Sequence, residues 1–138
     1  MPVTQDSFDL ECDRLSQVVD GVSFERLRWA RTEGPMLARL IELAQGAVAE
    51  REDFELTDEG STNALKRFVV KVHGTRVVAV GFRLDQGRVN LWAEAIERSR
   101  FTLESGDILE ADFADVDEAW MAAALGELFG RIRSIGSN

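Results

Sequence analysis

The sequence predicts a single α+β domain over residues 1–138, built on a mainly antiparallel sheet of four to five strands. Three β-rich runs, separated only by the turn sequences "HGT" and "DQG", predict an antiparallel meander over residues 66–97. Apolar residues recur with helical spacing before and after this meander. We therefore expect N-terminal helices and a C-terminal helix that packs on the sheet.

The first expected helix covers residues 7–19, with Asp6 as its N-cap. Its apolar positions form one stripe, made of Phe8, Cys12, Leu15 and Val19. Because its neighbours on this stripe are apolar, Cys12 is expected to be a buried, unreactive thiol. The next segment, residues 23–32, fits either a short helix or a strand.

A further helix is expected from Pro35 to about Ala49. Strands are predicted at 54–57, 66–73, 76–84, 88–97 and 107–113. The last helix is expected from about Val116 to Arg133, with Asp115 as its N-cap.

The two faces of the meander follow from its strand alternation and tight turns. One face is expected to carry Phe68, Val70, Val72, Val77, Ala79, Gly81, Leu91, Ala93 and Ala95. The other is expected to carry Val69, Val78, Val80, Phe82, Trp92 and Ile96, edged by Arg67, Lys71 and Glu94. Small residues at the centre of the first face suit close approach of the C-terminal helix.

The second face is the predicted interaction surface, because aromatic and arginine side chains are typical of interface centres. The residues assigned to it are Trp92, Phe82, Val80, Arg67, Lys71 and Glu94. We expect Trp92 at or beside the subunit contact of a homodimer. The alternative is that the N-terminal helices of the same chain cover this face.

The net charge of −9 opposes strong binding to nucleic acid or to anionic membranes. The charge is uneven, because residues 61–100 hold eight Lys and Arg against three Asp and Glu. A second basic cluster surrounds Trp29. If the chain does bind nucleic acid, the expected contacts are Arg26, Arg28, Arg31 and Arg39.

The stretch "FELTDEGSTNAL", residues 54–65, resembles the passage from wing to helix in winged-helix transcription regulators. The resemblance covers about a dozen residues and implies DNA binding through basic residues on the preceding helix. This chain departs from the family's pattern there, because that helix offers only Arg39, opposed by Glu42 and Glu50. The valine-rich meander is also foreign to the family's core.

Few residues suggest catalysis. The only histidine, His73, is expected at a hairpin corner, with Gly74 and Thr75 forming the turn and Arg76 opposite. One histidine and one cysteine cannot make a zinc site, and no phosphate-binding glycine motif is present, so neither metal nor cofactor is expected. The 25 Asp and Glu residues still allow a small carboxylate-dependent enzyme.

Compartment and function follow from these observations together. The N-terminus resembles no signal peptide, no apolar run approaches the length of a membrane span, and the lone Cys12 suits a reducing compartment, so a cytoplasmic location is expected. The expected function is a non-catalytic protein-interaction module, such as a small acidic chaperone, adaptor or immunity-type protein, acting as a homodimer. A nucleic-acid regulator and a small enzyme are the alternatives.

Overall fold

The computed structural model describes residues 5–62 and 65–135. Contacts group the chain into two compact units, the first ending at Pro35 and the second beginning at Met36. The single domain over residues 1–138 stays a prediction. None of the helices in the described ranges is long and apolar enough to cross a membrane.

The first unit holds two helices, α1 (Gln5–Val19) and α2 (Gly21–Arg31), and the start of α3 (Glu33–Val48). Asp20 separates α1 from α2 and caps α2, because its side chain accepts a hydrogen bond of 3.1 Å from the Ser23 amide. The segment that the sequence left ambiguous is therefore helical. No residue of α2 is buried.

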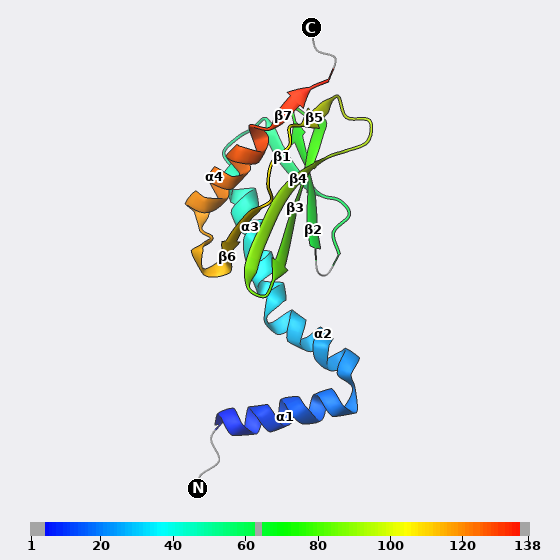
Figure 1. Cartoon of the computed structure of the whole chain (residues 1–138), viewed down its shortest axis with the longest axis vertical. Helices are drawn as coiled ribbons and strands as arrows, with labels where there is room; N and C mark the ends of the chain where they lie inside the picture. The colour runs from blue at the N-terminus through cyan, green and yellow to red at the C-terminus, as the bar shows by residue number, and fades with distance from the viewer. Residues whose placement is uncertain (1–4, 63–64, 136–138) are drawn as a thin grey trace. The chain divides into compact units, whose positions relative to one another are not determined.

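The second unit contains a five-stranded antiparallel sheet in the order β1-β2-β3-β4-β6 (Figure 1). The strands are β1 (Phe54–Asp58), β2 (Leu65–Val72), β3 (Thr75–Asp85), β4 (Arg88–Ala95) and β6 (Leu109–Asp112). The helix α4 (Glu118–Phe129) follows the sheet. The predicted α+β class, with N-terminal helices and a C-terminal helix, is confirmed.

Three local features differ from the prediction. The last helix is shorter than predicted, because Asp117 rather than Asp115 caps it and it ends at Gly130. The chain then forms β7 (Ile132–Ser134), which pairs with β5 (Phe101–Leu103) in a second small sheet. The winged-helix resemblance also implies that the strand ending in "LTDEG" leads into a helix, whereas the next element that the structure describes is strand β2 from Leu65.

The core lies between one face of the sheet and the helices α3 and α4, which lie together on that side (Figure 1). The sheet contributes chiefly Leu56, Phe68, Val70, Val78, Val80, Phe82, Val89 and Leu91. The helices contribute Leu37, Leu40, Leu43, Ala44, Val48, Met121, Ala124, Leu125 and Leu128. Burying an aliphatic side chain of this size stabilises a fold by about 1.5–3 kcal/mol.

A β-bulge in the β2–β3 hairpin decides which side of β3 enters this core. Lys71 pairs with Arg76, whereas Val70 pairs with Val78, so Val77 is an extra residue in β3. Each side chain of β3 beyond the bulge therefore points to the opposite face from an unbulged hairpin.

The turns of both hairpins are two residues long. His73 and Gly74 form the first, with φ of 51° and 77°, and Gln86 and Gly87 form the second, with φ of 50° and 79°. Left-handed φ at both central positions is the type I′ conformation, which suits antiparallel strands. The predicted turn at Gly74 and Thr75 is thus wrong by one residue.

The outer edge of β1 is partly closed by α3. The side-chain amide Nε2 of Gln45 donates a hydrogen bond of 3.1 Å to the backbone carbonyl of Leu56. Since β1 is an edge strand, this bond occupies a carbonyl that faces away from the sheet.

The turn conformation makes a testable prediction at His73. Replacing His73 by Val should lower the free energy of unfolding by about 1–2 kcal/mol, because a β-branched side chain is disfavoured at left-handed φ. His73→Asn should leave it unchanged or raise it slightly, because Asn-Gly is the preferred type I′ pair. Urea unfolding measures both, with Thr75→Val in the adjoining strand as control. Wild-type stability of His73→Val would contradict this turn.

Candidate interaction surface

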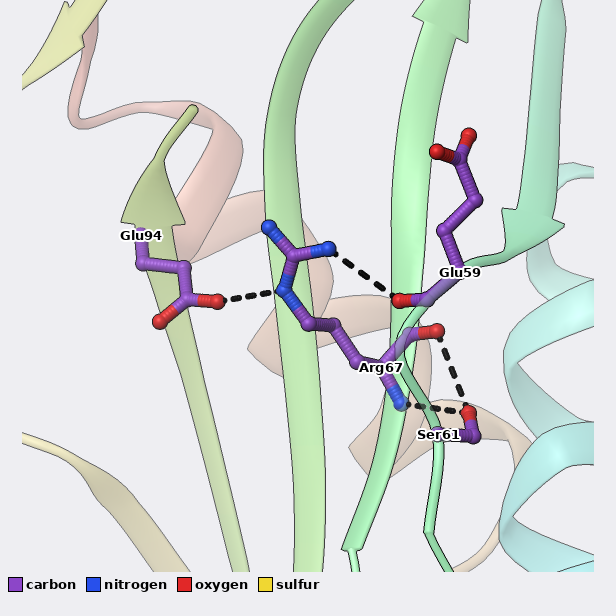
Figure 2. Close-up of polar contacts among 4 residues, drawn as sticks. All are labelled: Glu59, Ser61, Arg67 and Glu94. Carbon is purple, nitrogen blue, oxygen red and sulfur yellow. Dashed lines mark hydrogen bonds and ion pairs between the residues drawn. The ribbon is translucent and has the colours of Figure 1, made fainter. Parts of the chain in front are cut away.

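The sheet face that points away from α3 and α4 is spanned by an ion pair across β3. Arg67 on β2 is opposite Gly81 of β3, and Glu94 on β4 is opposite Ala79. The guanidinium Nε of Arg67 lies 2.6 Å from the Glu94 carboxylate, so the two side chains meet above the small residues of β3 (Figure 2). Larger side chains on β3 would prevent this contact.

Other bonds hold Arg67 in position. Its Nη1 donates to the backbone carbonyl of Glu59 at 3.1 Å, and its amide donates to Ser61 Oγ at 2.9 Å (Figure 2). The Arg67 side chain is 27% exposed, and the planar guanidinium bonds two partners at once. The residues that follow β1 therefore support this arginine on the sheet face.

Trp92 lies on the same face, against Gly81. A Cβ atom added to Gly81 would overlap the Trp92 ring, so glycine is required for the indole to lie flat on β3. Trp92 remains partly exposed. We call the set of Arg67, Lys71, Trp92 and Glu94 the Trp92 surface.

A hollow of about 380 Å³ adjoins Trp92 where the pairing of β4 with β6 ends at Leu91 and Leu109. Its lining residues are Arg83, Trp92, Ala93, Gly106, Asp107, Ile108 and Arg131. Ile108 is 52% exposed, which is unusual for an isoleucine. The Trp92 hollow thus combines the apolar side chains of Trp92 and Ile108 with two arginines and one aspartate.

The two arginines of the hollow differ in their partners. Arg131 donates to the backbone carbonyl of Asp107 at 3.0 Å and lies 3.2 Å from the Glu127 carboxylate. Arg83 makes no ion pair within the described ranges and is exposed. Arg83 is therefore the cation in this hollow that is available to an incoming anionic group.

Acidic residues outside the basic central segment neutralise part of it. Glu59 pairs with Arg76, and this hydrogen bond holds the pKa of the Glu59 carboxyl below its usual value. A depressed pKa stabilises the fold above the unfolded-state value and the contribution is lost as pH falls through the folded-state value. Arg88 pairs with Asp112 at 2.9 Å. The basic segment is thus not a continuous cationic surface.

The predicted interaction residues divide between the two faces. Arg67, Lys71, Trp92 and Glu94 share the open face, as predicted. The placement of Val80 and Phe82 beside them was wrong: both are fully buried against the helices. The Val77 bulge and the two-residue Gln86–Gly87 turn reverse β3 relative to both neighbours, and neither can be read from alternation alone.

Three further residues of this site, Arg83, Ile108 and Arg131, were not predicted from the sequence. Arg83 and Trp92 lie on the same face only in the observed register, in which Arg83 pairs with Asn90. Arg131 was assigned to a helix that ends earlier. A correct register for β3 and β4 would have indicated Arg83. It would not have indicated that the chain after α4 brings Arg131 to the hollow.

The three arginines that α2 contributes to the nucleic-acid alternative do not share one side of the helix. Arg26 and Arg28 are two positions apart on α2, so their side chains leave the helix about 160° apart. Arg28 is bonded to Glu25 at 3.0 Å, and Arg39, in the second unit, lies 3.2 Å from Glu42. These contacts reduce the charge available to phosphate.

His73 lines a broad open hollow of about 590 Å³ with four charged residues, Glu50, Arg51, Glu52 and Asp53. Arg51 binds Asp53 through two hydrogen bonds of 2.7 and 3.0 Å, and this contact lowers the pKa of the Asp53 carboxyl. The contact of His73 with Asp53 is a backbone bond, in which the His73 amide donates to the Asp53 carbonyl at 2.8 Å. This hollow shows no oriented acid–base pair.

Metal binding has no geometric support in residues 5–62 and 65–135, where no three His, Cys, Asp or Glu side chains gather closely enough to hold an ion.

Cys12 differs from its prediction, because it is exposed rather than buried. Its stripe on α1 is apolar, as expected, but the stripe packs on no core.

Comparisons with protein-family models, with curated proteins and with solved structures found no match to this chain. Function is therefore inferred from the chain's own geometry.

Gly81 provides a test of how Trp92 is held. Gly81→Ala should lower the free energy of unfolding by about 1–3 kcal/mol and change the tryptophan emission, because the new methyl group displaces the indole. Gly46→Ala on α3 is the control, since a Cβ there meets no atom within 4 Å. That variant should be as stable as wild type or more stable by about 0.5–1 kcal/mol. Equal effects of the two substitutions on urea unfolding would refute the packing argument.

Proposed function

We propose that this chain is a non-catalytic protein-interaction module, of the kind represented by small chaperones, adaptors and immunity proteins, and that it functions as a homodimer. We further propose that the Trp92 surface and the Trp92 hollow bind a partner protein. The protein is proposed to act in the cytoplasm.

The observation that carries this proposal is the partly exposed Trp92 beside the available guanidinium of Arg83. Tryptophan and arginine are the residue types most enriched among those that dominate binding energy. The indole is already fixed against Gly81, and Arg67 is already fixed by Glu94 and Glu59. A partner would therefore order few additional side chains, which lowers the entropic cost of binding.

The chemistry of the hollow indicates what the partner presents. Trp92 and Ile108 offer apolar contact, while Arg83 offers a cation without an ion-pair partner in the described chain. An apolar or aromatic side chain next to a carboxylate would satisfy both features. We propose such a segment on the surface of the partner protein.

The geometry supports the two alternatives less well. The arginines proposed for nucleic acid point in different directions or pair with carboxylates. The hollow at His73 has its central aspartate bound to Arg51. Neither arrangement concentrates the groups that phosphate binding or acid–base catalysis requires.

The test compares Trp92→Asp with Ala95→Asp as baits for affinity purification from the native host, followed by mass spectrometry. Trp92→Asp should weaken capture of the partner by roughly 30-fold or more, because it removes a central aromatic contact and places a charge in a desolvated interface. Ala95→Asp introduces the same charge on the same strand at an exposed position of the opposite face. It should retain the partner.

One further control completes this experiment. Circular dichroism should show both variants folded. Equal capture by wild type and Trp92→Asp would refute the proposed docking surface. If Trp92→Asp instead turns a dimer into a monomer in sedimentation, Trp92 lies at the subunit contact, as the sequence analysis expected, and the surface binds a second copy.

A further inference from the structure

The first unit exposes an apolar stripe on α1. Phe8 and Leu15 are each 57% exposed, Val19 is 76% exposed, and Cys12 is exposed between them. These residues follow one another at helical spacing, so they form a continuous line along one side of the helix. A helix with such a stripe normally buries it against another element.

α2 contacts α1 without burying this stripe. Between the two helices lies a groove of about 370 Å³. Its lining residues are Cys12, Asp13, Ser16, Phe24, Leu27, Arg28, Arg31 and Thr32. Cys12 belongs to both the stripe and the groove, so the apolar surface of α1 continues onto Phe24 and Leu27 of α2.

The spacing of the stripe is palindromic. Its four members are separated by four, three and four residues, and therefore the pattern reads the same in both directions. In an antiparallel pair of identical helices, Phe8 of one copy lies opposite Val19 of the other, and Cys12 lies opposite Leu15. Twofold symmetry requires this kind of self-complementary surface.

The charges of the two helices also favour pairing with α1 of a second copy. α1 has a net charge of −3, with four acidic residues and one arginine, and α2 has a net charge of +2. Asp13 and Arg31 line opposite sides of the groove, and neither makes an ion pair within the described part of the chain. An α1 helix placed in the groove brings its acidic flank toward the arginines of α2.

We propose that the first unit is the dimerisation element: α1 of a second copy lies antiparallel on α1, in the groove that α1 forms with α2. This inference rests on the homodimer of the proposed function and assigns its subunit contact. The stripe residues and Phe24 and Leu27 of both copies form the apolar seam, and Cys12 becomes shielded in the dimer.

The test is sedimentation equilibrium of the full chain, comparing Leu15→Glu with Leu10→Glu. Both leucines are on α1 and exposed, at 57% and 68%, but Leu10 points away from the stripe. Leu15→Glu should raise the dissociation constant of the dimer roughly 30-fold or more, because it places a charge in the seam. Leu10→Glu should dimerise as wild type does.

Cys12 supplies a second, independent measurement, since it is the only thiol in the chain. Labelling by a thiol reagent should slow as the concentration of wild type or Leu10→Glu rises. Labelling of Leu15→Glu should be fast at every concentration tested. Circular dichroism of the three proteins should show the same sheet signal, because no residue of the second unit changes.

The possible failures are distinguishable. If the wild type dimerises and Leu15→Glu dimerises equally well, the seam is wrong while the homodimer stands. If the wild type is monomeric at high concentration, with Cys12 labelled fast throughout, both the seam and the homodimer fail. If both glutamate variants dissociate equally, the contact does not follow the stripe and the antiparallel pairing is refuted.

Discussion

The extra residue at Val77 sets the orientation of the central strand, and the division between core and surface depends on it. Beyond the bulge, Val78, Val80 and Phe82 point into the core, while Ala79 and Gly81 point to the open face. A bulge exchanges the side chains of a strand between the two faces of the sheet and leaves the order of the strands unchanged. The core therefore receives the large residues, and the open face receives the small ones on which Trp92 and the Arg67–Glu94 pair rest.

The elements of this fold follow from local patterns, whereas the faces of β3 do not. Helical spacing and turn sequences predicted the α+β class and its antiparallel sheet. The flanking strands β2 and β4 were also assigned correctly relative to each other. The β2–β3 register and the β3–β4 register were each predicted wrongly, and the two errors cancel across β3. β3 is apolar from Val77 through Phe82, so alternation contains no information on which face is buried. The positions of Val80 and Phe82 were consequently wrong.

The candidate site shows the same limit at longer range. Arg67, Lys71, Trp92 and Glu94 could be grouped from strand alternation, which is local. Arg83 required the register of the β3–β4 hairpin, and Ile108 and Arg131 required the path of the chain after the sheet. Burial of Cys12 was predicted from its apolar neighbours, and the residue is exposed. An apolar stripe indicates only that the helix packs against another element. It does not state whether that element belongs to the same chain.

The hydrogen bond from Gln45 to Leu56 has a consequence for behaviour at high concentration. Edge strands with free carbonyl groups can act as templates on which further chains stack, and repeated stacking produces fibrils. On β1 the carbonyl at the middle of the strand is already occupied by a side chain from α3. Fibril growth from this edge would first have to break a bond that belongs to the native fold, so the helix protects the sheet as well as covering its core.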